Sequence, residues 1–171
     1  MIKLSDIVKS IKESQESYKI YLDIDGVLAD FDGGFKKLTG QYPNDFERKY
    51  GTEEFWRQIP TDTTKFWKEL EWMPDGKQLF QYTEKYKPTL LSAPSKAQTS
   101  KQGKREWRDI NIPGVKLILK GAKFKHEYAK PNHILIDDRA DNIERWISAG
   151  GIGIEHFDAV STIKKLKQLG L

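Results

Sequence analysis

Residues 18–32 read YKIYLDIDGVLADFD, and this stretch decides the fold. Its first part, residues 18–24, is rich in aromatic and β-branched residues, which is the composition of a buried strand. Asp23 and Asp25 stand at the end of that strand, and Gly26 follows at once. Because side chains on a strand alternate between its faces, the two carboxylates lean to the same side. Paired acids at the end of an interior strand repel each other, so the pattern indicates a bound cation or phosphate chemistry.

A second acidic pair of the same kind lies near the C-terminal end of the sequence. Residues 133–138 read HILIDD, an apolar run that ends in Asp137 and Asp138. In a parallel α/β sheet, ligands gather outside the carboxyl ends of the strands. We therefore expect the two pairs to share one cation site. The alternative for the first pair alone is a solvated turn that carries two acids by chance.

The composition is that of a globular chain. Its 171 residues suit one domain, or a core with a modest insertion, and 32% of them are charged. No apolar run of about 18 residues predicts a membrane span, and the first 14 residues are too charged for a signal peptide. The absence of cysteine excludes disulfides and favours a reducing, cytoplasmic setting. A formal net charge of +4 is compatible with anionic substrates and weakly with nucleic acid.

Residues 33–87 differ in character from the rest of the sequence. They are rich in aromatic and charged residues, contain no β-branched run and are punctuated by glycines and prolines. We interpret them as short helices at 33–39, 44–49, 52–58, 62–70 and 75–86. An all-helical insertion between the first two core strands is a cap. The predicted domains are therefore a core of residues 1–32 and 88–171 and a cap of residues 33–87.

Strands and helices alternate through the remainder of the chain. An amphipathic helix is expected at 5–16, packed on the core, with a partner-binding helix as a minor alternative. After the first strand, further strands are predicted at 89–93, 115–119, 133–136 and 152–154. The helices of the core are predicted at 101–110, 140–149 and 158–169. This alternation predicts an α/β fold, a doubly wound parallel sheet of about five strands with a small helical cap after the first.

The two acidic motifs together resemble a known superfamily. D-x-D-G-V at Asp23 and I-D-D at Asp137 are similar to motifs one and four of the haloacid dehalogenase (HAD) superfamily, Mg²⁺-dependent phosphohydrolases with an aspartate nucleophile. DIDGVLADF, residues 23–31, is similar almost residue for residue to the first motif of the 5′(3′)-deoxyribonucleotidases. The resemblance covers roughly residues 18–157. It implies hydrolysis of a small phosphate ester, a (deoxy)nucleoside monophosphate, with Mg²⁺ as the cofactor.

The resemblance implies a role for each of the four acids. Asp23 is the expected nucleophile, which forms an aspartyl-phosphate. The expected magnesium ligands are Asp23, the backbone carbonyl of Asp25 and the side chain of Asp138. Asp137 is then either a ligand through water or a residue that orients the other ligands. The side chain of Asp25 remains free to act as general acid and then general base.

A hydroxyl and a lysine complete the motifs of the superfamily. Ser92 matches the hydroxyl that binds a phosphoryl oxygen, but Ala93 stands where the close relatives carry a second hydroxyl. Lys104, in the run GKREW at 103–107, is the predicted lysine that offsets the charge on Asp23 and the phosphoryl group. The rival candidates for this role are Lys101, Lys123, Lys125 and Lys130.

Aromatic residues of the cap are candidates for enclosing the organic part of the substrate. Aromatic residues at helical spacing are more often part of a core than of a ligand platform. In the deoxyribonucleotidases, aromatic residues at matching positions enclose the nucleobase. The resemblance implies this role for Phe31, Phe55, Trp56 and Trp67.

Two alternatives to a nucleotidase remain open. One keeps the chemistry but acts on polynucleotide ends or small sugar phosphates. The other is a binding module that has the fold and no activity, against which the four acids and a candidate lysine argue. A cap over the strand ends closes on small ligands, so nucleic acid is not the favoured partner, and no membrane partner is expected.

Overall fold

The computed structural model describes residues 18–171, so the helix expected at 5–16 lies outside the described residues. Five parallel strands form one sheet in the order β3-β2-β1-β4-β5. Their bounds are β1 (Lys19–Leu22), β2 (Thr89–Ser92), β3 (Lys116–Leu119), β4 (His133–Asp137) and β5 (Ile152–Glu155). The predicted α/β fold with a parallel five-stranded sheet is confirmed.

The helices lie close to the predicted positions, with differences at 62–70, at the end of 75–86 and at 122–128. They are α2 (Phe31–Thr39), α3 (Pro43–Tyr50), α4 (Thr52–Arg57), α5 (Lys65–Lys68), α6 (Gly76–Thr83), η1 (Glu84–Tyr86), α7 (Gln98–Asn111), η2 (Ala122–Tyr128), α8 (Ala140–Ser148) and α9 (Ala159–Gln168). The helix predicted at 62–70 is shorter, because only α5 is helical there. The 3₁₀ segment η2 lies between two predicted strands, where no helix was predicted.

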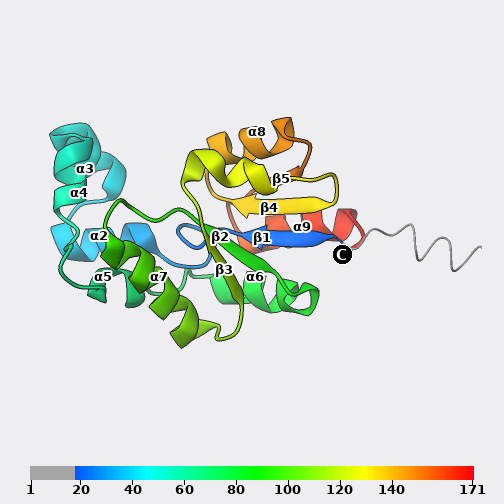
Figure 1. The fold of residues 1–171 in the computed structure, drawn as a ribbon, viewed down its shortest axis with the longest axis horizontal. Coiled ribbons are helices and arrows are strands. Elements are labelled where there is room, and N and C mark those ends of the chain that lie inside the picture. The colour runs from blue at the N-terminus through cyan, green and yellow to red at the C-terminus, as the bar shows by residue number, and fades with distance from the viewer. Residues whose placement is uncertain (1–17) are drawn as a thin grey trace, which may run out of the picture.

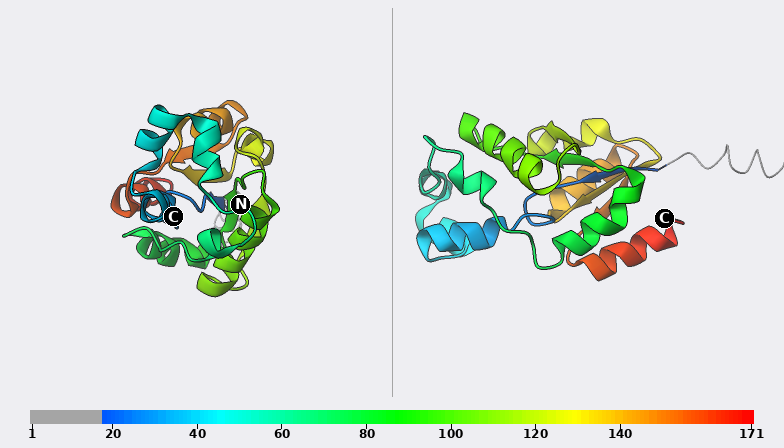
Figure 2. Two further views of the ribbon diagram at one scale, coloured as in Figure 1. Left: turned by 90° about the vertical axis from the view of Figure 1, so that its left-hand side faces the viewer. Right: turned by 90° about the horizontal axis from the view of Figure 1, so that it is seen from below.

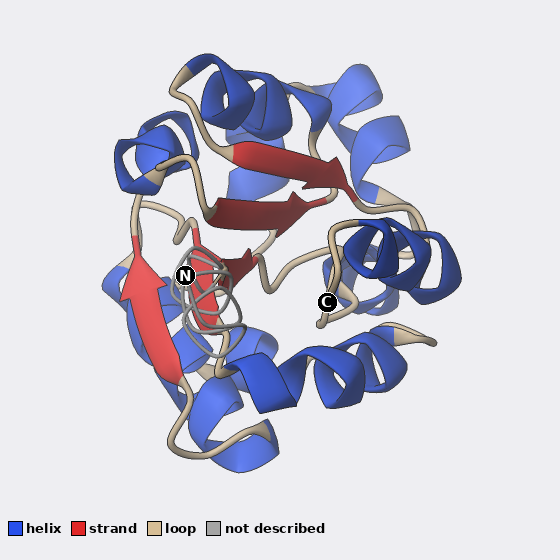
Figure 3. Ribbon diagram, turned by 90° about the vertical axis from the view of Figure 1, so that its right-hand side faces the viewer, coloured by secondary structure: helices blue, strands red, loops and turns tan. Residues whose placement is uncertain are grey.

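Helices cover both faces of the sheet, as Figure 3 shows with strands in red and helices in blue. On β1, Ile20 and Leu22 face one side, where they share a core with α6, α9 and Trp107 of α7. Tyr21 faces the other side and packs with Trp146 of α8. Because both faces are buried, the strands read as apolar runs rather than as an alternation of polar and apolar residues. Within residues 18–171, no helix has the length and apolar character needed to cross a bilayer.

The cap helices α2, α3, α4 and α5 gather at one end of the molecule, toward which β1 and β4 point (Figure 1). Two antiparallel segments carry the chain out to these helices and back. The Asp30 amide donates to the Glu71 carbonyl at 2.8 Å, and the Met73 amide donates to the Leu28 carbonyl at 2.7 Å. Helix α6 follows this crossing and packs against α9. We propose from these contacts a cap of residues 31–70, shorter than the predicted 33–87.

One side of the cap contacts the core, because α5 of the cap packs against α7 of the core (Figure 2). A Cβ atom on Gly103 of α7 would lie 2.4 Å from the Cβ of Trp67, so only glycine permits this approach. The Trp107 indole donates to the Leu70 carbonyl at 2.8 Å, and the Thr64 hydroxyl donates to Glu106 at 2.7 Å. These contacts fix α5 above the ends of the strands.

Candidate active site

The two acidic pairs meet at the carboxyl ends of adjacent strands. Asp23 follows β1, Asp137 ends β4, and the Asp23 amide donates to the Ile136 carbonyl at 2.9 Å. One carboxylate oxygen from each of Asp23, Asp137 and Asp138 lies within 4.8 Å of the others. Neighbouring parallel strands end at the same edge of a sheet, which brings together residues more than a hundred positions apart.

A single turn after β1 opens the space for these acids. The Ile24 carbonyl accepts from the amides of Leu28 and Ala29, both at 2.8 Å, so the chain reverses within a few residues. Gly26 in this turn has a φ of 74°. A Cβ atom there would lie 2.2 Å from a carboxylate oxygen of Asp138. Gly26 is therefore required both for the backbone conformation and for the approach of Asp138.

Lys125 is the cation that lies between the nucleophile candidate and the second acidic pair. Its ammonium group is 2.7 Å from Asp23 Oδ2 and 2.6 Å from Asp137 Oδ2, and its side chain is 1% exposed. Burial by itself lowers the pKa of Lys125, but the carboxylates of Asp23 and Asp137 outweigh burial and raise that pKa above its ordinary value. This rival candidate holds the position beside Asp23 that the sequence assigned to Lys104.

Lys104 instead pairs with the other acid of the first motif. Its ammonium group is 2.5 Å from Asp25 Oδ2 and lies over the ring of Trp67, 5.0 Å from the centroid. Burial raises the pKa of Asp25, and the negative charge of Asp23 adds to this effect, although Lys104 opposes it. Asp25 Oδ1 is buried and accepts no hydrogen bond within residues 18–171. A carboxyl with a raised pKa and one free oxygen suits transfer of a proton.

Asp137 and Asp138 differ in their surroundings. Asp137 is fully buried and accepts from Lys125, from the Asn142 side chain at 2.9 Å and from the Arg139 amide at 3.0 Å. Asp138 faces the cavity, and no lysine or arginine of the described chain forms an ion pair with it. Asp138 therefore has its oxygens free for a ligand, whereas the hydrogen bonds of Asp137 hold it in place.

The carboxylate cluster fits a magnesium ion. Partial removal from water, together with the negative charges of Asp23 and Asp137, raises the pKa of Asp138 to about 7. Burial and the charge of Asp23 also raise the pKa of Asp137. A bound cation relieves this repulsion, and Mg²⁺ prefers carboxylate and carbonyl oxygens of this kind. Asp23, Asp138 and the Asp25 carbonyl are the groups expected to hold it.

Ser92 lies at the carboxyl end of β2, beside β1 in the sheet. Its hydroxyl is buried and has no hydrogen-bond partner among the described residues. A buried hydroxyl without a partner is uncommon, and it is compatible with a ligand oxygen as the missing partner. The expected contact of Ser92 with a phosphoryl oxygen remains a prediction. Ala93, at the position for which the sequence comparison above led us to expect a second hydroxyl, lines the cavity.

A cavity of about 860 Å³ lies between the strand ends and the cap. The four aromatic residues singled out in the sequence all line it: Phe31, Phe55, Trp56 and Trp67. The rings of Phe31 and Trp67 lie 5.7 Å apart, centroid to centroid. Phe55 and Trp67 are buried within the cap, whereas Trp56 is 42% exposed. The buried rings form the wall of the cavity, and Trp56 is the exposed ring among the four.

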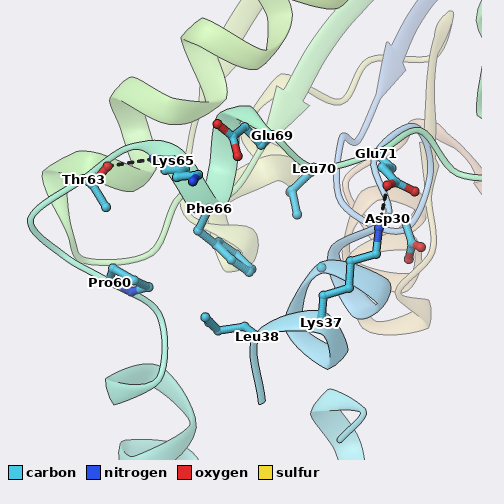
Figure 4. A pocket seen from close by; sticks show the side chains of 11 residues that line it. Asp30, Lys37, Leu38, Pro60, Thr63, Lys65, Phe66, Glu69, Leu70 and Glu71 are labelled. Carbon is cyan, nitrogen blue, oxygen red and sulfur yellow. Dashed lines mark hydrogen bonds and ion pairs between the residues drawn. The ribbon is translucent and has the colours of Figure 1, made fainter. Parts of the chain in front are cut away.

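A second hollow of about 540 Å³ lies on the cap between α2 and α5 (Figure 4). Lys37 and Glu71 pair there at 2.5 Å, and both side chains are largely exposed. The Phe66 ring lines this hollow and packs edge-on against Phe31, which lines the larger cavity. Neither Asp23 nor any other acid of the two motifs lines it. The larger cavity is therefore the candidate active site.

The larger cavity also has polar lining residues that the sequence did not single out. They are Asp30, Asp32, Asn44, Glu47, Thr52 and Ser95. Asn142 also lines the cavity, and its side chain donates to Asp137 at 2.9 Å. On α3 and α4 the polar residues have the pattern of a solvated helix face. No feature of the sequence distinguishes them from such a face, so they were not predictable.

Comparison with known proteins supports the fold. No protein-family model matches the sequence, and no curated protein matches it significantly. A hydrolase from Streptococcus pneumoniae is similar in structure, with a TM-score of 0.54 and 14% identity, over 88% of this chain and 99% of that one. A HAD-family enzyme from Bacteroides thetaiotaomicron, solved with magnesium and inorganic phosphate, has a TM-score of 0.46 and 15% identity, over 82% of this chain and 94% of that one.

These findings define the class of the fold. The five-stranded parallel sheet with helices on both faces is the predicted α/β architecture, and the first of these structures, a hydrolase, shares it. Identity of 14% establishes a shared fold and leaves the activity to the chemistry of the site. The comparisons do not single out the deoxyribonucleotidases.

Proposed function

We propose that the protein is a magnesium-dependent phosphatase of the HAD type, which hydrolyses small phosphate monoesters through an aspartyl-phosphate on Asp23. The observation that carries the proposal is the cluster at the strand ends. Three carboxylates lie together beside the buried Lys125, beneath a cavity large enough for a small ester. A binding module without activity would have no need of repelling, buried carboxylates at this place.

The residues support a two-step reaction. The Asp23 carboxylate attacks phosphorus, the ester P–O bond breaks, and the leaving oxygen takes the proton of Asp25. Water then attacks the phosphorus of the aspartyl-phosphate and gives its proton to Asp25. Inorganic phosphate leaves, and Asp23 returns to its carboxylate form. Lys125 offsets negative charge beside the nucleophile, and the free hydroxyl of Ser92 donates to a phosphoryl oxygen. Bound Mg²⁺ would supply charge neutralisation between the Asp23 carboxylate and the phosphoryl group.

We infer further that the substrate is a nucleoside monophosphate, of the kind that 5′(3′)-deoxyribonucleotidases hydrolyse. Phe31, Trp56 and Trp67 line the cavity that also holds the acids, which supports a flat substrate beside the phosphate. Base–aromatic stacking contributes about 1–3 kcal/mol per base. Because the cap covers the strand ends, a free nucleotide is favoured over the end of a polynucleotide.

Release of phosphate from 4-nitrophenyl phosphate tests the chemistry, with Mg²⁺ and with excess chelator. We expect turnover only with Mg²⁺, and Asp23→Asn should retain less than about a hundredth of the rate. The matched control is Asp109→Asn, which removes an exposed carboxylate of α7 outside the cavity. Full activity in chelator, or equal activity of the two variants, would contradict the proposal.

The same assay tests the substrate. The kcat/KM values of deoxynucleoside monophosphates, a sugar phosphate and an oligonucleotide with a terminal phosphate are compared. We expect kcat/KM to be roughly tenfold or more higher for the nucleotides than for the sugar phosphate, because stacking of one base on an aromatic ring contributes about that much. If the oligonucleotide is the best substrate, the nucleotide assignment is wrong, while the phosphatase chemistry stands.

A further inference from the structure

The cap side of the cavity has a polar patch on two short helices. We name this patch the roof, and it consists of Asn44 and Glu47 of α3 with Thr52 and Trp56 of α4. Positions three or four residues apart share one face of a helix, so each pair is presented together. The Thr52 hydroxyl donates to Glu47 Oε1 at 2.6 Å, which fixes the carboxylate at the edge of the cavity.

The charges of the cavity are distributed unevenly. The lining residues of the cap side include the acids Glu47, Asp30 and Asp32, but no lysine or arginine among the described residues. The two cations of the lining, Lys125 and Arg139, both lie beside the acids at the strand ends. Lys125 is bound to two carboxylates there. Both cations therefore lie where the phosphate of a substrate would bind, and neither lies on the cap side, where its organic part would bind.

Trp67 adds to the cap side a buried donor without a partner in the described part of the chain. Trp67 is 2% exposed and lines the cavity, and its indole N–H has no acceptor among residues 18–171. Buried donors are satisfied in most native structures, so a ligand acceptor is compatible with this position. Asn44 adds a donor and an acceptor, and Glu47 adds an acceptor only. The cap side thus offers aromatic surface and hydrogen bonds, with a local excess of negative charge.

We propose that the roof selects phosphate monoesters whose organic part has no second negative charge and carries hydroxyl or amino donors, with Glu47 as the specificity-determining residue. This proposal rests on the proposed phosphatase function of the same cavity. A second phosphate or a carboxylate on the substrate would lie near Glu47 without a cation to pair with it. Repulsion between like charges a few ångströms apart, in a cavity partly shielded from salt, disfavours such esters by roughly tenfold or more.

Matched aryl esters test the proposal: phenyl phosphate and 4-carboxyphenyl phosphate. We expect the wild-type protein to prefer the neutral ester by at least about tenfold in kcat/KM, mainly through KM. Glu47→Gln retains the acceptor for the Thr52 hydroxyl but removes the charge. Glu47→Gln should reduce the ratio of the two kcat/KM values, neutral ester over carboxylated ester, by roughly fivefold. Glu47→Lys should reduce that ratio further. Comparing the ratio between variants cancels the different intrinsic reactivities of the esters.

The control variant is Glu53→Gln on α4. Glu53 pairs with Arg57 at 2.6 Å and does not line the cavity, so this change alters the net charge equally but leaves the roof intact. Its preference should equal that of the wild-type protein. If the ratio of kcat/KM values for the two esters is the same in Glu47→Gln as in Glu53→Gln, Glu47 does not determine the specificity. Equal kcat/KM for the two esters in the wild-type protein would overturn the selectivity.

Binding of non-hydrolysable analogues separates this proposal from the phosphatase function. The affinities of phenylphosphonate and 4-carboxyphenylphosphonate are measured by calorimetry with Mg²⁺ present. Tighter binding of the neutral phosphonate, with the preference reduced in Glu47→Gln, supports the roof even if no ester is hydrolysed. Absence of turnover then counts against the phosphatase chemistry alone. Equal binding of the two phosphonates counts against the roof alone.

Discussion

The two sides of the cavity are built on different physical principles. The side at the strand ends holds charged groups in fixed contacts, because Lys125 is buried between Asp23 and Asp137. The cap side presents aromatic rings and the half-buried carboxylate of Glu47 on short helices. Removing one member of a buried ionic cluster leaves an uncompensated charge in the protein. Removing a cap residue takes away only a contact with the organic part of the substrate or a repulsion of its second charge. We therefore expect large effects on chemistry from the first side and graded effects on substrate choice from the second.

The two buried lysines offer the largest test of this difference. Lys125→Met removes the cation shared by Asp23 and Asp137, so we expect kcat/KM to fall by roughly a hundredfold or more for every ester. Lys104→Met removes the partner of Asp25, so we expect a fall of roughly tenfold. The measurement is kcat/KM of both variants with 4-nitrophenyl phosphate and with an alkyl phosphate.

The leaving group separates the roles of the lysines. If Lys104 acts through Asp25, its replacement affects the alkyl phosphate more, because an alkoxide needs the proton and nitrophenolate does not. Lys125→Met should affect both esters alike. Thermal unfolding accompanies the kinetics, since loss of a buried partner costs roughly 3–5 kcal/mol of stability. A larger, leaving-group-independent loss in Lys104→Met would restore Lys104 as the lysine that serves Asp23.

Two tryptophans sharpen the comparison on the cap side. Trp56 is 42% exposed, so Trp56→Ala should raise KM for a nucleotide roughly tenfold and leave the melting temperature nearly unchanged. Trp67 is 2% exposed and packed against Gly103, so Trp67→Ala should destabilise the protein by roughly 3–5 kcal/mol. Calorimetric unfolding and KM are measured for both variants. An unchanged nucleotide KM in Trp56→Ala would show that this ring does not contact the base.

The smallest expected effect is a pH dependence of magnesium binding. The pKa of Asp138 is raised to about 7, so a proton competes with the cation at lower pH. The ionised fraction rises roughly fivefold between about pH 6 and about pH 7, and the affinity for Mg²⁺ should rise with it. Calorimetric titration at the two pH values measures this. Asp138→Asn should remove most of the dependence, whereas an unchanged slope in that variant would exclude Asp138 as its source.

The same raised pKa sets the sign of a stability effect. A carboxyl whose pKa is higher in the folded protein binds its proton more tightly there than in the unfolded chain. Without Mg²⁺, the contribution of Asp138 to stability is therefore present near pH 4 and is lost as the pH rises through about 7. Saturating Mg²⁺ should reverse this loss, because the cation replaces the proton.

Local pattern was sufficient to predict the sheet and its acidic edge. Apolar runs that end in acids identify β1 and β4, and alternation with helices predicts a parallel order. Adjacent parallel strands end at the same edge of a sheet. The proximity of Asp23 and Asp137 could therefore be predicted from the sequence. Gly26, which follows the paired acids directly in the sequence, provides the positive φ that the sharp turn needs.

Only the tertiary structure decided which lysine serves which acid and what the cap presents to a ligand. Lys125 lies on a short 3₁₀ segment that was not predicted as a helix, and its burial comes from the packing of that segment against α8. Lys104 reaches Asp25 across 79 positions of the chain. In the sequence both lysines, and Glu47 on α3, are indistinguishable from solvated charges. Local pattern does not encode which of many similar charges is buried, because burial depends on the packing of distant segments.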